Sequence, residues 1–203
     1  MPTQTVKSSA RAARADQRRQ QILNAALGCF RREGFHGASM DQISKAAGMS
    51  VGHIYHYFEN KEAIIAAIVE RDVAELEADF EKIRASADVA AAMVQHAAGV
   101  IARGDHASDG GFRLEMLAEA TRSPRIAAIL QDAHREIGRM VVDTMRHANP
   151  GLSEAEAQTK FELLGALFAG LDIAMVRSPG LDRARLSADL LKTIQHVLGE
   201  TKS

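Results

Sequence analysis

Apolar residues recur at steps of three and four positions along most of the chain, the spacing of one face of an α-helix. Near the N-terminus, Ile22, Ala26, Cys29 and Phe30 form such a stripe, and Gly34 ends it as a residue that tolerates positive φ. Past residue 87 no segment alternates apolar and polar residues in the manner of a strand. The pattern therefore predicts an all-α protein.

Capping residues and glycine or proline breaks divide this pattern into about nine helices. Ser39 and Gln42 form a capping box, and Ser153 and Glu156 form another. Pro124 stands at the first helical position after a capping serine, so it opens a long helix. The predicted helices cover residues 16–33, 40–47, 51–58, 61–84, 89–103, 112–121, 124–147, 153–177 and 182–199.

Two segments lack this periodicity. Residues 1–15 are polar, so we expect a flexible basic arm there, and residues 104–111 are predicted to form a loop. The two short helices around the turn at Gly48 indicate a helix-turn-helix at about 39–58. We therefore divide the chain into the arm at 1–15, a helix-turn-helix domain at 16–62 and a larger C-terminal domain at 63–203.

Composition is that of an ordinary folded protein, with 203 residues of which 46% are apolar and 25% charged. The single cysteine, Cys29, excludes an internal disulfide framework and fits a reducing cytoplasm. Because it lies on the apolar stripe, we interpret it as a small core residue rather than a nucleophile. No apolar run is long enough to span a membrane, and the basic N-terminus lacks the apolar segment of a secretory signal.

The net charge of −1 is unevenly distributed. Residues 1–62 contain nine lysines and arginines against five aspartates and glutamates, a net charge of +4, and the remainder carries −5. A basic N-terminal part is typical of proteins that bind a polyanion. Basic residues expected to add salt-dependent affinity for DNA, or to reach the minor groove, are Arg11, Arg14, Arg18 and Arg19.

The segment from Val51 to Phe58 is unusual for a surface helix. Ile54 and Phe58 lie four residues apart and can face the core, which leaves the remaining positions outward. Glycine inside a helix costs about 1 kcal/mol relative to alanine, and Gly52 is explained if another backbone must come close. Tyrosine and histidine side chains suit phosphates, sugars and base edges. The outward positions are Val51, Gly52, His53, Tyr55, His56 and Tyr57.

Lys61 stands in the first turn of the next helix, where a cation opposes the helix dipole. A phosphate docked at that helix N-terminus would make the position favourable, because it would pair with the free amides and with the lysine. A solvated surface lysine explains the residue equally well, so both interpretations stay open.

One ordered set of residues lies between about Arg18 and Arg71: Gly34-Phe35, Ser39, Ile43, Ala47-Gly48-Met49-Ser50-Val51-Gly52, Ile54-Tyr55, Tyr57-Phe58 and Lys61-Glu62. This set resembles the N-terminal domain of the TetR family of transcriptional regulators. Met49 stands where valine is usual, and Met40 stands where threonine often contacts a phosphate, so one backbone contact is expected to be missing. Residues 112–136 resemble, more loosely, the C-terminal domain of some members.

The resemblance implies an all-helical homodimer whose third helix enters the DNA major groove and whose C-terminal domain binds a small-molecule inducer. We therefore expect a repressor that the inducer releases from a pseudo-palindromic operator. Control by a protein partner is the alternative, and a helical-bundle enzyme is a remote one. The DNA contacts implied are Ser50, Gly52, His53, Tyr55, His56, Tyr57 and Lys61, with Ser39 near a phosphate, and we include Val51 as their outward neighbour.

Helix 153–177 carries two apolar stripes, and the resemblance implies that it joins helix 182–199 in a four-helix dimer interface. One stripe, at heptad spacing, begins at Ala157, and the other consists of Leu163, Leu167, Gly170 and Ala174. One can face its own domain and the other the partner, or both can be buried within a single-domain bundle. The predicted interface residues are Phe161, Leu164, Phe168, Leu171, Met175, Leu190, Ile194 and Val197.

Candidates for a ligand pocket are soft, polar or aromatic residues on apolar helix faces of the C-terminal domain, although each is also compatible with ordinary core or surface. The eight histidines show no metal-binding spacing, and motifs for catalysis or phosphate binding are missing. We therefore expect no enzyme activity, no cofactor and no metal. The pocket candidates are Met93, His96, Phe112, Met116, His134, Met140 and Phe168.

Overall fold

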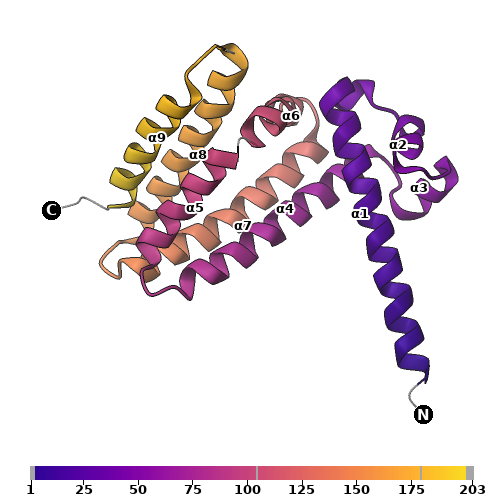
Figure 1. Cartoon of the computed structure of the whole chain (residues 1–203), viewed down its shortest axis with the longest axis horizontal. Helices are drawn as coiled ribbons and strands as arrows, with labels where there is room; N and C mark the ends of the chain where they lie inside the picture. Colours follow the sequence, from indigo (N-terminus) through magenta and orange to yellow (C-terminus); the bar gives the residue numbers. More distant parts are fainter. Residues whose placement is uncertain (1–2, 104, 179, 200–203) are drawn as a thin grey trace. The chain divides into compact units, whose positions relative to one another are not determined.

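The computed structural model of the protein describes residues 3–103, 105–178 and 180–199. These residues form nine α-helices and no strand, so the predicted all-α class is confirmed (Figure 1). None of these helices is both long enough and apolar enough to cross a membrane. In chain order the helices are α1 (Thr3–Gly37), α2 (Met40–Ala47), α3 (Val51–Tyr57), α4 (Lys61–Arg84), α5 (Val89–Arg103), α6 (Asp105–Ala120), α7 (Pro124–Ala148), α8 (Glu154–Arg177) and α9 (Arg183–Leu198).

The chain divides into two compact units, Met1–Val69 and Glu70–Ser203. The division runs through α4, whereas the sequence placed it at the start of that helix. The first unit contains α1, α2, α3 and the beginning of α4, and the second contains the rest of the chain.

Helix α1 begins at Thr3, so the prediction of a flexible arm followed by a helix from Asp16 is wrong for the residues that the structure describes. The segment between these residues is rich in alanine and arginine, which have high helix propensity even where no apolar stripe marks a packed face. The N-terminal part of α1 extends past α2 and α3 (Figure 1).

Helix α6 begins at Asp105, so the predicted loop is wrong over residues 105–111. Gly110 is buried against α8, where a Cβ atom would lie 3.0 Å from Oδ1 of Asp172. The glycine therefore admits a close helix approach and does not mark a loop. Arg113, one turn further along α6, donates to Asp172 from Nε over 2.9 Å and from Nη2 over 2.7 Å.

The core of the first unit is formed by residues from all four of its helices. Cys29 is 1% exposed, as expected for a core residue. Gly34 has φ 73, which ends the regular part of α1 where the sequence predicted its end. The largest fully buried side chains of this core are Ile22, Leu23, Phe30, Ile43, Ile54, Ile64, Ile65 and Ile68.

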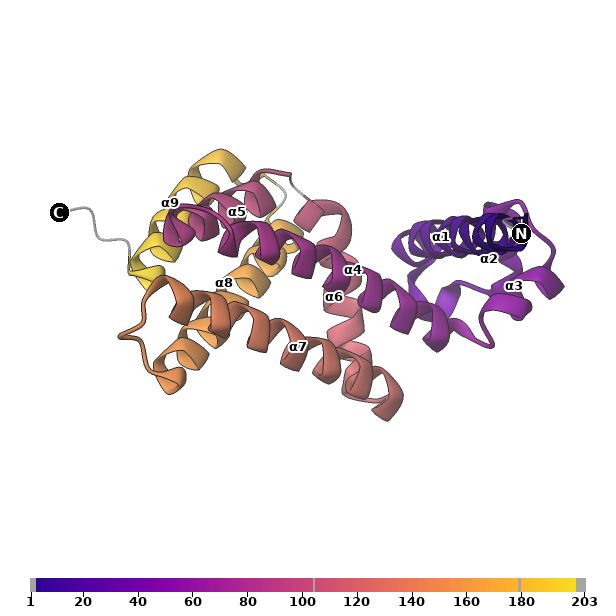
Figure 2. The same ribbon diagram turned by 90° about the horizontal axis from the view of Figure 1, so that it is seen from below.

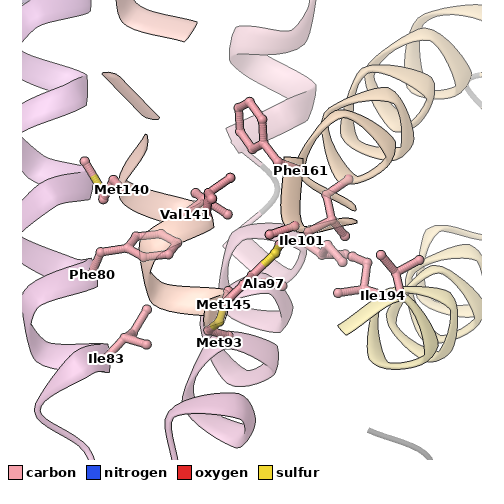
Figure 3. Packing of buried hydrophobic residues seen from close by; sticks show 14 of the residues in the cluster. Phe80, Ile83, Met93, Ala97, Ile101, Met140, Val141, Met145, Phe161 and Ile194 are labelled. Atoms are coloured by element: carbon pink, nitrogen blue, oxygen red, sulfur yellow. The ribbon is translucent and has the colours of Figure 1, made fainter. Parts of the chain in front are cut away.

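The core of the second unit forms where α5, α7, α8 and α9 pack together with the C-terminal part of α4 (Figures 2 and 3). Figure 3 shows Met93, Ala97 and Ile101 of α5 pointing toward Ile194 of α9 and the side chains of α7. The capping box at the start of α8 is present as predicted. There, hydrogen bonds from the side chain and backbone of Ser153 hold the pKa of Glu156 below its ordinary value.

The interface predicted on the first stripe of α8 needs correction, because these side chains lie in the core of their own unit. Phe161, Leu164 and Leu171 are at most 9% exposed, and Ile194 and Val197 of α9 are equally enclosed. Phe168, Met175 and Leu190 are half-buried and pack against the same cluster. Two stripes on one helix look alike in sequence, and the packing of α5, α7 and α9 decides which one is covered.

Another apolar face of α8 remains exposed in this chain. Leu163 is 47% exposed, Ile173 48% and Val176 61%. Ala166 and Gly170 are exposed between them. These five positions follow one another at steps of three and four, so they form a continuous face, which we call the outer stripe of α8.

Candidate nucleic-acid interface

Helix α2 and the turn after it are held by local hydrogen bonds. Ser39 caps α2: its Oγ accepts from the amide of Gln42 over 3.2 Å, and its own amide donates to Oε1 of Gln42 over 2.7 Å. Gly48 ends the helix with φ 64 and ψ 34, a left-handed conformation. The amide of Met49 then donates to Ser44 O over 2.9 Å, which closes the turn. The predicted capping box and helix end are confirmed.

Helix α1 anchors both of the short helices. Gln21 donates from Nε2 to Ala47 O over 2.7 Å, which satisfies a carbonyl at the end of α2. The guanidinium carbon of Arg19 lies 5.1 Å from the centroid of the Phe58 ring, next to the end of α3. This role of Gln21 has no signal in the sequence, because a partner 26 residues away leaves no local pattern.

Helix α3 is a single short helix whose rotation is fixed by two buried side chains. Ser50 caps it by accepting from the amide of His53 over 3.3 Å. Ile54 is 0% exposed and Phe58 3%. The outward orientation predicted for the other positions is confirmed: Gly52, His53, Tyr55 and His56 are exposed, and Val51 and Tyr57 are half-buried.

Contacts between aromatic rings stabilise the exposed face of α3. The ring centroids of His53 and Tyr57 lie 5.4 Å apart, and those of His56 and Tyr57 lie 5.5 Å apart, both in edge-on arrangements. Tyr55 is 51% exposed. From Ser50 to Phe58 there is no carboxylate in the sequence, so this face does not repel a polyanion. We call these outward residues, from Val51 to Tyr57 without Ile54, the α3 rim.

Gly52 lies in the α3 rim with open space around it. A Cβ atom at this position would meet nothing within 4 Å. Packing inside the protein therefore does not require glycine there, and the residue leaves room for a molecule outside. Gly48 differs, because its positive φ requires glycine for the backbone itself.

Two predicted phosphate ligands already have partners within the protein. The hydroxyl of Ser39 is exposed but donates to Oε1 of Gln42 over 2.9 Å. Nζ of Lys61 donates to Phe35 O over 2.5 Å and to Ala38 O over 2.8 Å. The structure thus brings Lys61 to the turn before α2, which neither of its sequence interpretations anticipated.

The basic residues of α1 differ in their surroundings. Arg14 and Arg18 are exposed, and Arg18 donates from Nη1 to Gln21 Oε1 over 3.0 Å. Arg19 is half-buried and contacts Phe58, as described above. The side chain of Arg11 lies outside the described residues. The exposed arginines are therefore on a helix rather than on the predicted arm.

The predicted ligand-pocket residues do not gather around one cavity. Met93 and Met140 belong to the buried core of the second unit (Figure 3), and Met116 is buried on α6. His96 is half-buried and lines a groove of about 270 Å³ with residues of α4 and α5. Phe112 and Phe168 are half-buried and line neither this groove nor the one beside His134.

His134 lies on the surface and lines a separate groove of about 480 Å³, mainly with charged residues of α7. Its Nε2 lies 3.0 Å from Oε1 of Glu162, and this hydrogen bond lowers the pKa of Glu162. The imidazole is therefore paired with a carboxylate at the surface, and its role in binding a ligand stays a prediction.

Two family profiles match the chain. One, described as bacterial regulatory proteins of the tetR family, matches residues 22–68. The other, described as the C-terminal domain of BetI-type transcriptional repressors, matches residues 105–199. Together they cover most of both compact units.

Individual proteins with similar sequences are regulators. The chain is 36% identical over 136 residues to the HTH-type transcriptional regulator UidR of Escherichia coli (strain K12), which covers 66% of this chain and 67% of UidR. It is 38% identical over 81 residues to the HTH-type transcriptional repressor NicS of Pseudomonas putida, covering 40% of this chain and 38% of NicS. The structure of Salmonella enterica GusR is similar with a TM-score of 0.72 and 26% identity, over 90% of this chain and 95% of GusR.

The two glycines of this region give a matched pair of alanine substitutions. Gly48→Ala should lower the free energy of unfolding by about 1–2 kcal/mol, because alanine is strained in the left-handed conformation. Gly52→Ala should raise it by up to about 1 kcal/mol, because the position is helical and the added methyl group has room. Urea denaturation at one protein concentration measures both. A destabilising Gly52→Ala would contradict the open surroundings of Gly52.

Proposed function

The chain belongs to the TetR family of bacterial regulatory proteins, and we propose that it is a repressor that binds a pseudo-palindromic operator as a homodimer and leaves it when a small molecule binds. As a member of this family it is a DNA-binding transcriptional regulator. The observation that carries the finer proposal is the α3 rim: an exposed helix face of tyrosine, histidine and glycine without a carboxylate. Because such a regulator acts on chromosomal DNA, we also propose a cytoplasmic location.

The α3 rim has the properties that reading a major groove requires. An α-helix fits the groove, whose base edges present hydrogen-bond donors and acceptors. Gly52 lets the helix backbone approach, and His53, Tyr55 and His56 supply side chains that bond to base edges and phosphates. In a symmetric dimer, two such helices read half-sites about one helical turn apart, about 34 Å.

Basic residues on α1 are proposed to contact phosphates. Arg14 and Arg18 are exposed on a helix, so they are held at fixed spacing along one side of it. Such contacts position the protein without reading sequence, and they weaken as salt rises. This proposal replaces the flexible arm with a helix.

We propose the outer stripe of α8 as the dimer contact, in place of the buried stripe. Leu163, Ile173 and Val176 supply exposed apolar area, and Ala166 and Gly170 allow close helix approach. A Cβ atom at Gly170 would meet nothing within 4 Å, so nothing in this chain fills that space. A self-complementary apolar stripe fits the isologous contact of a two-fold dimer.

An inducer is proposed to act on the second unit. Met93 and Met140, which the sequence suggested as pocket residues, are buried in the core of the second unit. Methionine side chains are flexible, so a ligand can bind a state in which they have moved. The ligand releases DNA only if it binds that state more tightly than the operator-bound one.

The operator proposal predicts sequence-selective binding that depends on the α3 rim. Fluorescence anisotropy with the DNA upstream of the gene should show tighter binding than to a scrambled duplex at about 150 mM salt. Tyr55→Ala should weaken operator binding about tenfold or more, because it removes a contact to base or backbone. Leu117→Ala, which removes an exposed side chain on α6, is the control. Equal affinity for operator and scrambled DNA would refute the proposed function.

The dimer proposal predicts that charge on the outer stripe separates the subunits. The double substitution Leu163→Glu and Ile173→Glu should give a monomer in light scattering with unchanged helix content, because both side chains are already exposed in one chain. Its operator affinity should fall at least about a hundredfold, since only one half-site is then held. Leu117→Glu should remain a dimer. A dimeric double variant would place the interface elsewhere.

A further inference from the structure

The ammonium group of Lys61 lies among three backbone carbonyl oxygens at the C-terminal end of α1 and in the turn that follows it. Nζ is 2.5 Å from Phe35 O, 2.8 Å from Ala38 O and 3.5 Å from His36 O. It also lies 4.7 Å from the centroid of the Phe35 ring. An ammonium group has three donors and no acceptor, so these carbonyls satisfy it. We call this arrangement the carbonyl cage.

The turn has a physical need for a cation at this place. Gly34 leaves the helical conformation with φ 73 and ψ 167, so the regular hydrogen-bond pattern of α1 is interrupted at this point. Phe35 and Ala38 are buried, with 3% and 1% exposure, so water reaches these two residues poorly, whereas His36 between them is exposed. A cation beside carbonyls at a helix C-terminus is favourable, and Lys61 supplies it from a distant part of the sequence.

The carbonyl cage fixes the backbone directly before α2, the first helix of the helix-turn-helix. Ala38 is followed directly by Ser39, which caps α2, and α2 leads through the Gly48 turn to α3. A shift at Ala38 would therefore move the cap of α2 and, through α2, the α3 rim. Lys61 is thus coupled to the rim through the backbone, without a contact to it.

We propose that Lys61 is a positioning residue for operator recognition: it fixes the α1–α2 turn and thereby the α3 rim, and it does not contact a DNA phosphate. This inference rests on the proposed function. A phosphate contact would require Nζ to give up its hydrogen bonds to Phe35 O and Ala38 O, which are both partly buried. The two roles differ in a measurable way, because each phosphate contact adds about 0.9 to the slope of log affinity against log salt concentration.

The test is Lys61→Met, which keeps an unbranched stem over Phe35 and removes the charge and all three donors. We expect operator affinity to fall about tenfold while affinity for scrambled duplex and the salt slope stay unchanged. Lys82→Met is the control for loss of one positive charge, because Lys82 is an exposed lysine of α4 that pairs with Asp79. Circular dichroism checks that both variants remain helical.

Two results would overturn the proposal. If the salt slope falls by about 0.9 and binding to operator and scrambled DNA weakens equally, Lys61 contacts a phosphate. If operator affinity does not change, the carbonyl cage does not position the rim. A wild-type protein that binds operator and scrambled DNA equally would instead refute the proposed function. The carbonyl cage would then be tested by NMR on the free protein.

The wild-type protein provides a test that does not depend on a variant's folding. In the carbonyl cage, the Nζ protons exchange slowly with water, so the Lys61 ammonium signal should be visible by NMR at neutral pH without DNA. It should keep its chemical shift when operator is added. A signal that is missing in the free protein and appears only with DNA would show that the phosphate, and not the turn, holds Lys61.

Discussion

The burial of two side chains, Ile54 and Phe58, determines which residues of α3 the first unit exposes. Helix α3 has seven residues, too few to be stable as an isolated helix, so packing supplies its stability. With Ile54 and Phe58 in the core, the rotation of the helix is set and every other position must face outward or sideways. The exposed rim is therefore a consequence of the core, and a residue that disturbs the core also reorients the rim.

Hydrogen bonds to backbone then fix where this helix lies relative to its neighbours. Gln21 satisfies the last carbonyl of α2, and Lys61 satisfies the turn before it. Between α2 and α3, Gly48 adopts a left-handed backbone conformation that would be strained in a residue with a side chain. Each end of α2 is held by a side chain from another helix, which is how a helix of eight residues keeps one orientation.

Local signals in the sequence were sufficient for most helix ends. Capping boxes at Ser39 and Ser153 and the proline at 124 lie where the structure has helix starts, because these groups act within one turn of their own position. The starts of α1 and α6 were missed, because both segments are helical without an apolar stripe or cap to mark them. Helix propensity alone is too weak a signal to separate such segments from a loop.

Contacts between distant residues could not be predicted in this way. Lys61 meets carbonyls 23 to 26 residues away, and Arg113 meets a carboxylate 59 residues away. The same limitation affected α8, where two stripes of similar composition left open which one its own unit covers. It also affected the ligand candidates, because Met93 and Met140 look alike in sequence whether they line a cavity or fill it.

In the proposed function, the distribution of charge separates affinity from specificity. The α3 rim contains no lysine, arginine or carboxylate, so the DNA contacts proposed for it would act only at short range and would depend on matching groups in the groove. The phosphate contacts proposed for the exposed Arg14 and Arg18 of α1 would act at longer range on any phosphate backbone. Because Nζ of Lys61 is bonded to carbonyls of its own chain, we expect it to add little to this second contribution. On this proposal, binding to DNA of any sequence depends on α1, and the choice of sequence depends on how the turn and the core hold α3.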